Sequence, residues 1–232
     1  MTQKIKVALV TGADGALGAV VARKFAAAGI TVVGTRLGQG GQELSALDKD
    51  GIRWLPVNLS RSAEVKAAFR TLEAQKLAVD ALVHCAGGFR YGELATLTDE
   101  DFEFLVDANL KSSFFLAREA IVGMKARGYG RILFISSKVT LAPPANMAAY
   151  AATKIALNAL TVGLADEVKG QDITVNAVLP SVIDTPANRA AMPNENPAKW
   201  VSPAALADIL FHFTQPASDA VTGALLTVNG RV

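Results

Sequence analysis

The sequence predicts an α/β protein built on one doubly wound, parallel sheet of about seven strands, with helices on both faces. Three observations support this class. Apolar residues make up 51% of the 232 positions, which is enough to bury a sheet on both sides. Strand-like runs alternate with helical periodicity from end to end. No segment resembles a linker, a low-complexity tract or an internal repeat, so we expect a single domain over residues 1–232.

The expected strands are short apolar runs rich in β-branched residues. They are Val7–Val10, Thr31–Thr35, Arg53–Val57, Ala81–His84, Arg131–Ile135, Thr174–Leu179 and Leu225–Val228.

Helical periodicity fills the intervals between these strands. Ala16–Ala28 carries apolar residues on one face and is followed by Gly29, where a helix stops. The pattern recurs in Ala63–Leu72 and Phe115–Ala126, and Thr98 is the expected N-cap of a helix entering Phe102–Val106. Proline and asparagine interrupt Pro186–Pro203, which we expect to be a mobile substrate-binding loop.

Composition excludes several classes of function. The net charge is only +2, and no basic cluster interleaves with aromatic residues, so we expect no nucleic-acid partner. The single cysteine, Cys85, excludes an internal disulfide and fits a reducing compartment. The apolar run at the N-terminus is too short for a signal peptide and no stretch is long enough to span a bilayer. We therefore expect a cytoplasmic protein with no membrane partner and no metal site.

The first chemical motif is the glycine-rich turn Thr11–Gly18, which joins the first strand to the first helix. Such a turn lets the backbone approach a pyrophosphate, whose charge is favoured by exposed N–H groups and the helix dipole. Its position at the first strand–helix junction favours a dinucleotide site.

The end of the second strand is expected to meet the adenosine ribose of such a dinucleotide. A carboxylate there favours ribose hydroxyls, whereas a basic residue favours a 2′-phosphate. The strand ends in Arg36, which predicts a preference for NADP(H), while NAD(H) stays possible. Asp14 in the turn argues in the opposite direction, because its negative charge disfavours the extra phosphate.

A second motif places Tyr150 four residues before Lys154, so that the phenol and the ammonium lie on one helix face. A free tyrosine has a pKa near ~10, which is too high for efficient proton exchange at neutral pH. A neighbouring cation is expected to lower that pKa.

Together these motifs resemble the short-chain dehydrogenase/reductase family over nearly the whole chain. The glycine turn is followed in order by Asn109, by Ser137 thirteen residues before Tyr150, and by Lys154. Asn176-Ala177-Val178-Leu179-Pro180 and a terminal Gly223…Val228-Asn229-Gly230 complete the match. The resemblance implies a Rossmann-type domain and hydride transfer between nicotinamide and a carbonyl or alcohol carbon.

The family's catalytic roles map onto four matched residues. Tyr150 would be the acid/base, and Lys154 would lower its pKa and bind the nicotinamide ribose. Ser137 would hydrogen-bond the substrate oxygen, a role for which Ser136 is the neighbouring competitor. Asn109 would hold the water chain that supplies protons through Lys154.

The resemblance also implies a set of cofactor contacts. These are Gly12, Asp14, Gly15, Ala16, Leu17, Gly18, Arg36, Asn58, Leu59, Ala86, Gly87, Tyr150, Lys154, Pro180, Ile183 and Thr185.

The chain departs from the family pattern after the fourth strand. His84 and Cys85 replace the first two residues of the family's Asn-Asn-Ala-Gly, and we expect a structural histidine and an inert thiol. Ala86-Gly87-Gly88-Phe89 and the segment around Trp200 are similar to dihydropteridine reductases, so a pterin reductase is an alternative function. A dinucleotide-binding redox sensor without turnover is a second alternative.

Substrate specificity is expected in three segments, Phe89–Leu94, Thr140–Met147 and Pro186–Trp200, whose apolar residues predict a mainly apolar pocket for a small carbonyl or alcohol. The resemblance also implies a homo-oligomer, a tetramer or dimer, assembled through the helices Leu110–Arg127 and Tyr150–Lys169.

Overall fold

A computed structural model describes residues 5–38, 41 and 43–231. It contains one seven-stranded sheet in the order β3-β2-β1-β4-β5-β6-β7, and every neighbouring pair is parallel. The predicted fold class is therefore confirmed. The strand order reverses between β1 and β4, which is where ligands bind in doubly wound sheets.

All seven expected strands form, with ends within two residues of the expected ones. They are β1 Val7–Thr11, β2 Thr31–Arg36, β3 Ile52–Pro56, β4 Ala81–His84, β5 Tyr129–Ile135, β6 Asp172–Pro180 and β7 Leu225–Val228. The central strands are buried on both faces, as their continuous apolar runs predict.

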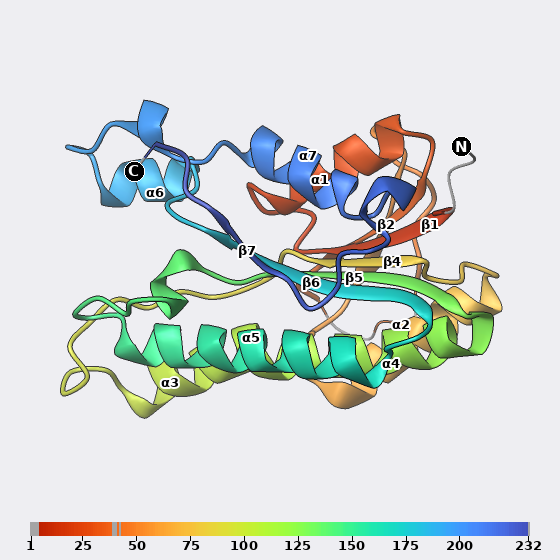
Figure 1. Cartoon of the computed structure of the whole chain (residues 1–232), viewed down its shortest axis with the longest axis horizontal. Helices are drawn as coiled ribbons and strands as arrows, with labels where there is room; N and C mark the ends of the chain where they lie inside the picture. Colours follow the sequence, from red (N-terminus) through yellow and green to blue (C-terminus); the bar gives the residue numbers. More distant parts are fainter. Residues whose placement is uncertain (1–4, 39–40, 42, 232) are drawn as a thin grey trace.

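Helices cover the sheet in two layers (Figure 1). α1 (Gly18–Ala27) and α7 (Pro203–His212) pack together on one face, and α2 (Ser62–Ala74), α4 (Ser112–Arg127) and α5 (Ala148–Glu167) lie on the other. Each layer encloses its own apolar core, one around Phe25 and one around Met124. The expected helix at 16–28 begins two residues late, because 12–17 forms the glycine turn.

A π-helical turn joins two helices that the sequence predicts as separate. α3 (Asp99–Val106) begins at Thr98, whose side chain accepts a hydrogen bond from Asp101 N as expected for an N-cap. It then continues through η1 (Asp107–Lys111) directly into α4. Extra π-type turns of this kind occur frequently at functional sites, and this one carries Asn109.

The segment Pro186–Pro203 contains more regular structure than its composition predicts. Its start forms α6 (Pro186–Ala191), a 3₁₀ turn, η3, follows at Pro197–Lys199, and Trp200 and Val201 are buried. Val201 N also donates to Val182 O across 2.9 Å. That this loop moves stays a prediction.

Among the described residues, one helix, α5, has the length and hydropathy of a membrane-spanning helix. It packs against β6, and its buried residues include Thr153 and Lys154. It thus forms part of the helical layer over the sheet.

Candidate active site

The glycine turn is shaped by two close backbone approaches. Gly12 has a φ of 59°, which favours glycine, and its carbonyl accepts a hydrogen bond from Gly15 N over 2.9 Å. A Cβ on Gly12 would lie 3.0 Å from the Cα of Ala86, and a Cβ on Gly18 would lie 2.1 Å from the Gly12 oxygen. Gly12 therefore lets the turn pack against the loop after β4, and Gly18 lets α1 pack closely against the turn.

A cavity of about 620 Å³ opens beside this turn, a size typical of small-molecule and cofactor sites. It follows the carboxyl ends of β1, β2, β3 and β4. Of the predicted cofactor contacts, the cavity is lined by Gly12, Asp14, Gly15, Arg36, Asn58, Leu59, Ala86 and Gly87.

The remaining predicted contacts lie elsewhere. Ala16 is exposed outside the cavity, and Leu17 is buried in the core beneath α1. Tyr150 and Lys154 stand at the start of α5, and Pro180, Ile183 and Thr185 lie in and after β6, beyond the cavity lining.

The end of β2 presents a fixed cation to the cavity. The Arg36 guanidinium lies 5.8 Å from the centroid of the Trp54 ring, a cation–π contact that orients this exposed side chain. Asn58, one of the predicted cofactor contacts, already accepts from both Ser60 N (3.0 Å) and Ser60 Oγ (2.9 Å) through Oδ1. Its amide nitrogen is therefore the more accessible end.

Ser137 and Tyr150 are brought together from two elements that the sequence separates. Ser137 follows β5 and Tyr150 lies in the first turn of α5, and the Ser137 hydroxyl is close enough to lower the pKa of the Tyr150 phenol. The Ser136 hydroxyl instead donates to the backbone oxygen of Lys154 (3.4 Å). The choice of Ser137 over its neighbour agrees with this geometry.

The pKa of Tyr150 differs from the expectation drawn from the sequence. Burial raises it above the ordinary tyrosine value, and the Ser137 hydroxyl only partly opposes this effect. Lys154 is not among the groups that shift it; its ammonium donates to Ile135 O over 2.9 Å and lies 5.9 Å from the Tyr150 ring centroid. The expected lowering by Lys154 is therefore wrong for this geometry, and Tyr150 is a protonated phenol at neutral pH.

Lys154 is a buried cation whose pKa is lowered by the loss of solvent. Its side chain is buried, and burial lowers its pKa from 10.5 to about 8. Burying an ammonium without a carboxylate partner costs folding free energy. Such a group is therefore typical of a functional site and not of a structural ion pair.

This burial predicts that Lys154→Met stabilises the protein. At pH 7 the pKa shift corresponds to about 3 kcal/mol, and the unpaired Ile135 carbonyl returns about 1–2 kcal/mol of that. The free energy of unfolding in urea should rise by about 1–2 kcal/mol. Because the folded-state pKa is depressed, wild-type stability increases between pH 8 and 10.5, and the gain of the variant should shrink over that range. A variant less stable than wild type at pH 7 would contradict this account.

Asn109 holds the loop after β4 against α5. Its Nδ2 donates to Gly88 O (2.9 Å) and Thr153 Oγ1 (3.2 Å), and its Oδ1 accepts from Gly88 N (3.0 Å). A Cβ on Gly87 would lie 3.0 Å from Asn109 Oδ1 and 3.4 Å from Lys154 Nζ. Gly87 therefore leaves a cradle between Asn109, Lys154 and the cavity.

His84, which ends β4, is buried, Cys85 directly after it is partly buried, and both are uncharged. Burial, aided by the charge of Lys154, lowers the pKa of His84 to about 3. Burial raises the pKa of the Cys85 thiol to about 12. These directions agree with a neutral structural histidine and an unreactive cysteine.

An aromatic contact that the sequence did not reveal covers Tyr150. The half-exposed Phe89 ring packs edge-on against the Tyr150 ring, with centroids 4.9 Å apart. Phe89 belongs to one of the expected specificity segments, but no pattern in the sequence pairs it with Tyr150.

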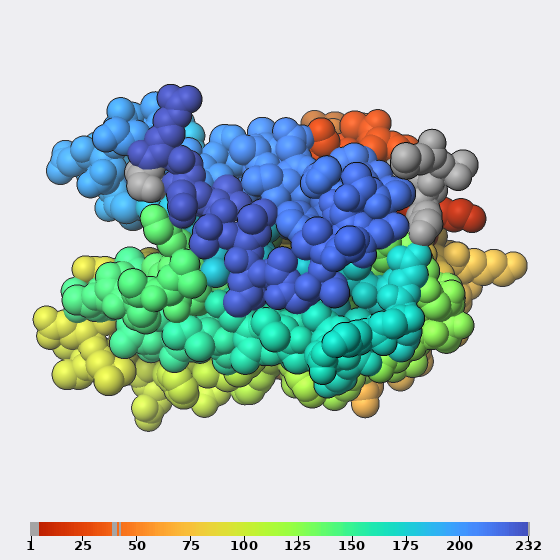
Figure 2. All heavy atoms as spheres, in the orientation of Figure 1, coloured from red at the N-terminus to blue at the C-terminus, as the bar shows by residue number. Residues whose placement is uncertain are grey.

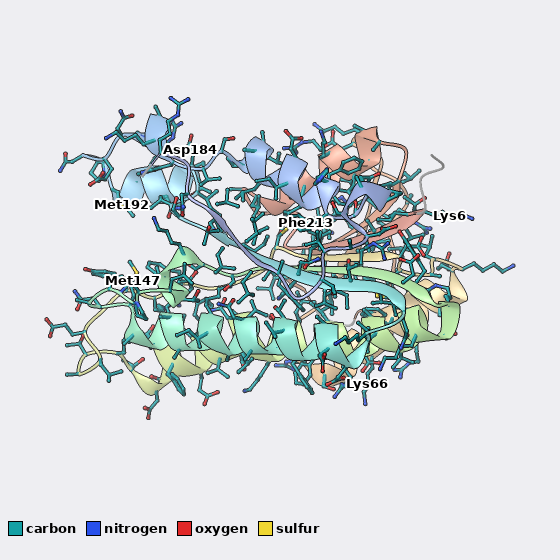
Figure 3. All side chains as sticks on the ribbon, in the orientation of Figure 1. Lys6, Lys66, Met147, Asp184, Met192 and Phe213 are labelled. Atoms are coloured by element: carbon teal, nitrogen blue, oxygen red, sulfur yellow. The ribbon has the colours of Figure 1, made fainter. Side chains whose placement is uncertain are left out.

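The segments expected to surround the substrate meet at one end of the molecule. Figure 3 places Met147 on one side of the sheet layer there, with Met192 and Asp184 on the other. Figure 2 shows an indentation of the surface between the 186–199 segment and the 138–147 segment. Thr185 caps α6 by accepting from Asn188 N (3.2 Å), so its hydroxyl keeps its proton available for donation.

Comparison with known proteins places this arrangement in a family. Residues 6–196 match the family model for short chain dehydrogenases. The 3-oxoacyl-[acyl-carrier-protein] reductase FabG of Rickettsia bellii is 34% identical, with 96% of this chain and 95% of that protein covered. FabG of Vibrio harveyi is 28% identical (97% and 96% covered), and Nodulation protein G of Rhizobium sp. is 36% identical (77% and 73%). The chain therefore belongs to the short-chain dehydrogenase family and is an oxidoreductase that acts on carbonyl or alcohol groups.

Proposed function

We propose that this protein is an NADP(H)-dependent oxidoreductase that interconverts a small carbonyl compound and its alcohol, with Tyr150 as the acid/base. The observation that carries the proposal is that the Ser137 hydroxyl, the Tyr150 phenol and the buried ammonium of Lys154 lie together where β5 ends and α5 begins. Two hydroxyls meeting there can bind one carbonyl oxygen together, which is the arrangement that carbonyl reduction requires.

Two features of the cavity support binding of a nicotinamide dinucleotide. Gly12 and Gly15 expose backbone at the start of α1, and the Gly87 cradle leads from the cavity to Lys154. When bound, such a cofactor supplies or accepts the hydride. We propose contacts from the residues that line the cavity, with Lys154, Ile183 and Thr185 holding the nicotinamide end.

Each residue of the proposed site has one task. Ser137 donates to the substrate oxygen and stabilises the charge that develops on it. Tyr150 gives its proton to that oxygen in reduction and removes one in oxidation. Lys154 holds the cofactor ribose, and Asn109 ties the Gly88 backbone to Thr153, the residue before Lys154. Because burial raises the pKa of Tyr150, the phenol is protonated at neutral pH, which is the form that donates a proton in reduction.

The surroundings of Tyr150 support an apolar substrate. Phe89, Tyr91, Leu94 and Leu141 are exposed large apolar side chains in the segments next to the site. The name shared by several relatives supports 3-oxoacyl thioesters as the first compounds to try.

A substrate panel tests the proposal. We expect NADPH oxidation with 3-oxoacyl thioesters or activated ketones at pH 7, and slower oxidation of the matching alcohols that accelerates as pH rises. The acceleration follows because the base form of Tyr150 is scarce when its pKa is raised. Turnover of a quinonoid dihydropterin alone would favour the pterin reductase instead. Cofactor binding without turnover of any compound would favour a redox sensor.

We also propose that α4 and α5 form the interface of a homo-oligomer. Phe114 and Val122 on α4 and Ile155 and Val162 on α5 are exposed, and a Cβ on Gly163 would meet no atom within 4 Å. Light scattering coupled to gel filtration is expected to give a dimer or tetramer, and a monomer at micromolar concentration would contradict this.

A further inference from the structure

A chain of hydrogen bonds passes through the buried imidazole of His84. Thr11 Oγ1 lies 2.6 Å from His84 Nδ1 and accepts from Ala86 N (3.2 Å). On the other side of the ring, His84 Nε2 lies 3.1 Å from Ser112 Oγ, which donates to Ala108 O (2.7 Å). The chain thus runs from the glycine turn, through the loop after β4, to the π-helical turn.

The direction of every bond in this chain is fixed by its last acceptor. A carbonyl oxygen only accepts hydrogen bonds, so the Ser112 hydroxyl donates its proton to Ala108 O. Ser112 Oγ must therefore accept its second hydrogen bond from His84 Nε2–H. The neutral ring then accepts at Nδ1, and the Thr11 hydroxyl donates to it. Only a neutral imidazole with its proton on Nε2 satisfies all of these bonds.

The groups joined by His84 belong to the cofactor site and to the segment that carries Asn109. Ala86, Ala108 and Ser112 line the cavity, and Asn109 directly follows Ala108 in the π-helical turn. His84 also packs edge-on against Phe134 of β5, which fixes the plane of its ring. No shorter side chain at this position reaches Thr11 and Ser112 together.

We propose that His84 is a positioning residue that sets the Ala86–Gly87 backbone and the Asn109 turn relative to each other through its two ring nitrogens. The inference rests on the proposed function. The Nδ1 side holds the backbone that would contact the cofactor, and the Nε2 side holds the turn whose Asn109 contacts Gly88 and Thr153. The two sides are separable by substitution.

Two amide variants divide the two roles. His84→Asn places an amide near the former Nδ1 and keeps the bond to Thr11, but it does not reach Ser112. His84→Gln reaches Ser112 and loses Thr11. We expect His84→Gln to raise the dissociation constant of NADPH, measured by its fluorescence, about tenfold, and His84→Asn to lower kcat about tenfold with cofactor affinity nearly unchanged, since one buried hydrogen bond is lost in each.

Ser112→Ala tests the same link without altering the ring. It should reproduce the effect of His84→Asn, and the double variant should be no worse than either single one. Thr161→Val is the matched control, because the buried Thr161 Oγ1 also donates to the carbonyl four residues back (Leu157 O, 2.8 Å) but lies on α5, away from His84 and the π-helical turn. Additive effects in the double variant, or equal effects of the Asn and Gln variants on affinity and kcat, would overturn the proposal.

The hydrogen-bond chain through His84 can also be tested by a measurement that does not depend on activity. The chain has only two histidines, so a His212→Gln variant assigns the ¹⁵N resonances of His84. We expect the Nε2–H tautomer of a neutral ring from pH 8 down to pH 5. An Nδ1–H tautomer, or titration in that range, would overturn the inference even if carbonyl reduction is confirmed. The expected tautomer together with an inactive enzyme would overturn only the proposed function.

Discussion

Replacing Tyr150 with phenylalanine should lower kcat for carbonyl reduction by about 10²–10⁴-fold, the usual contribution of a positioned general acid. The change removes one oxygen atom and leaves the ring that packs against Phe89 at 4.9 Å. The substrate oxygen would keep the Ser137 hydroxyl but lose its proton donor, so charge left by hydride arrival would stay unneutralised. Steady-state kinetics with NADPH and the best compound of the panel measures this effect.

Measuring cofactor affinity distinguishes the loss of the proton donor in Tyr150→Phe from disruption of the cofactor site. The dissociation constant of NADPH should change less than about threefold in Tyr150→Phe, because the cavity beside the glycine turn does not include the phenol. Tyr129→Phe is the matched control, since Tyr129 begins β5 at the opposite end of the strand from Ser137. Equal kcat values for Tyr150→Phe and the parent would discard the assignment of the acid, and equal losses in both variants would point to a general effect of removing a phenol.

The sheet could be predicted from the sequence because each buried strand is a continuous apolar run. Seven runs gave seven strands, and the alternation with helices gave their parallel order. The π-helical turn was not predictable, since Phe102–Val106 and Phe115–Ala126 read as two helices and periodicity does not show an inserted residue. α7 was also missed, although Ser202 as N-cap and Pro203 in the first turn are ordinary signals of a helix start.

The sequence predicted which residues form the candidate site better than it predicted their pKa values. Helical spacing paired Tyr150 with Lys154, the family resemblance added Ser137, and the structure has the three side chains close together. The pKa of Tyr150 depends on how deeply the phenol is buried and on where the ammonium points, and neither follows from a spacing of four. The His84 chain was equally hidden, because it joins residues 11, 84 and 112 through contacts that only the folded sheet creates.

The second large effect is expected at Arg36, where Arg36→Asp should change which dinucleotide the protein prefers. The guanidinium ends β2 at the rim of the cavity, held near Trp54, and no carboxylate follows it there to take the ribose hydroxyls. A 2′-phosphate would lose a charge-assisted hydrogen bond and meet a negative charge, so kcat/KM for NADPH should fall about 10–100-fold. The new carboxylate can accept from both hydroxyls of an unphosphorylated ribose, so kcat/KM for NADH should rise several-fold.

Arg23→Asp is the control that keeps the charge balance equal. Both variants take the net charge from +2 to 0, but Arg23 lies on the exposed side of α1 and outside the cavity lining. The ratio of kcat/KM for NADPH to that for NADH should therefore stay near the parental value in Arg23→Asp and invert in Arg36→Asp. Raising the salt concentration should weaken NADPH binding in the parent more than in Arg36→Asp, because an exposed ion pair is screened. An unchanged ratio in Arg36→Asp would mean that Arg36 does not recognise the 2′-phosphate. The glycine turn would then have to bind this phosphate, and another group would have to neutralise the negative charge of Asp14 there.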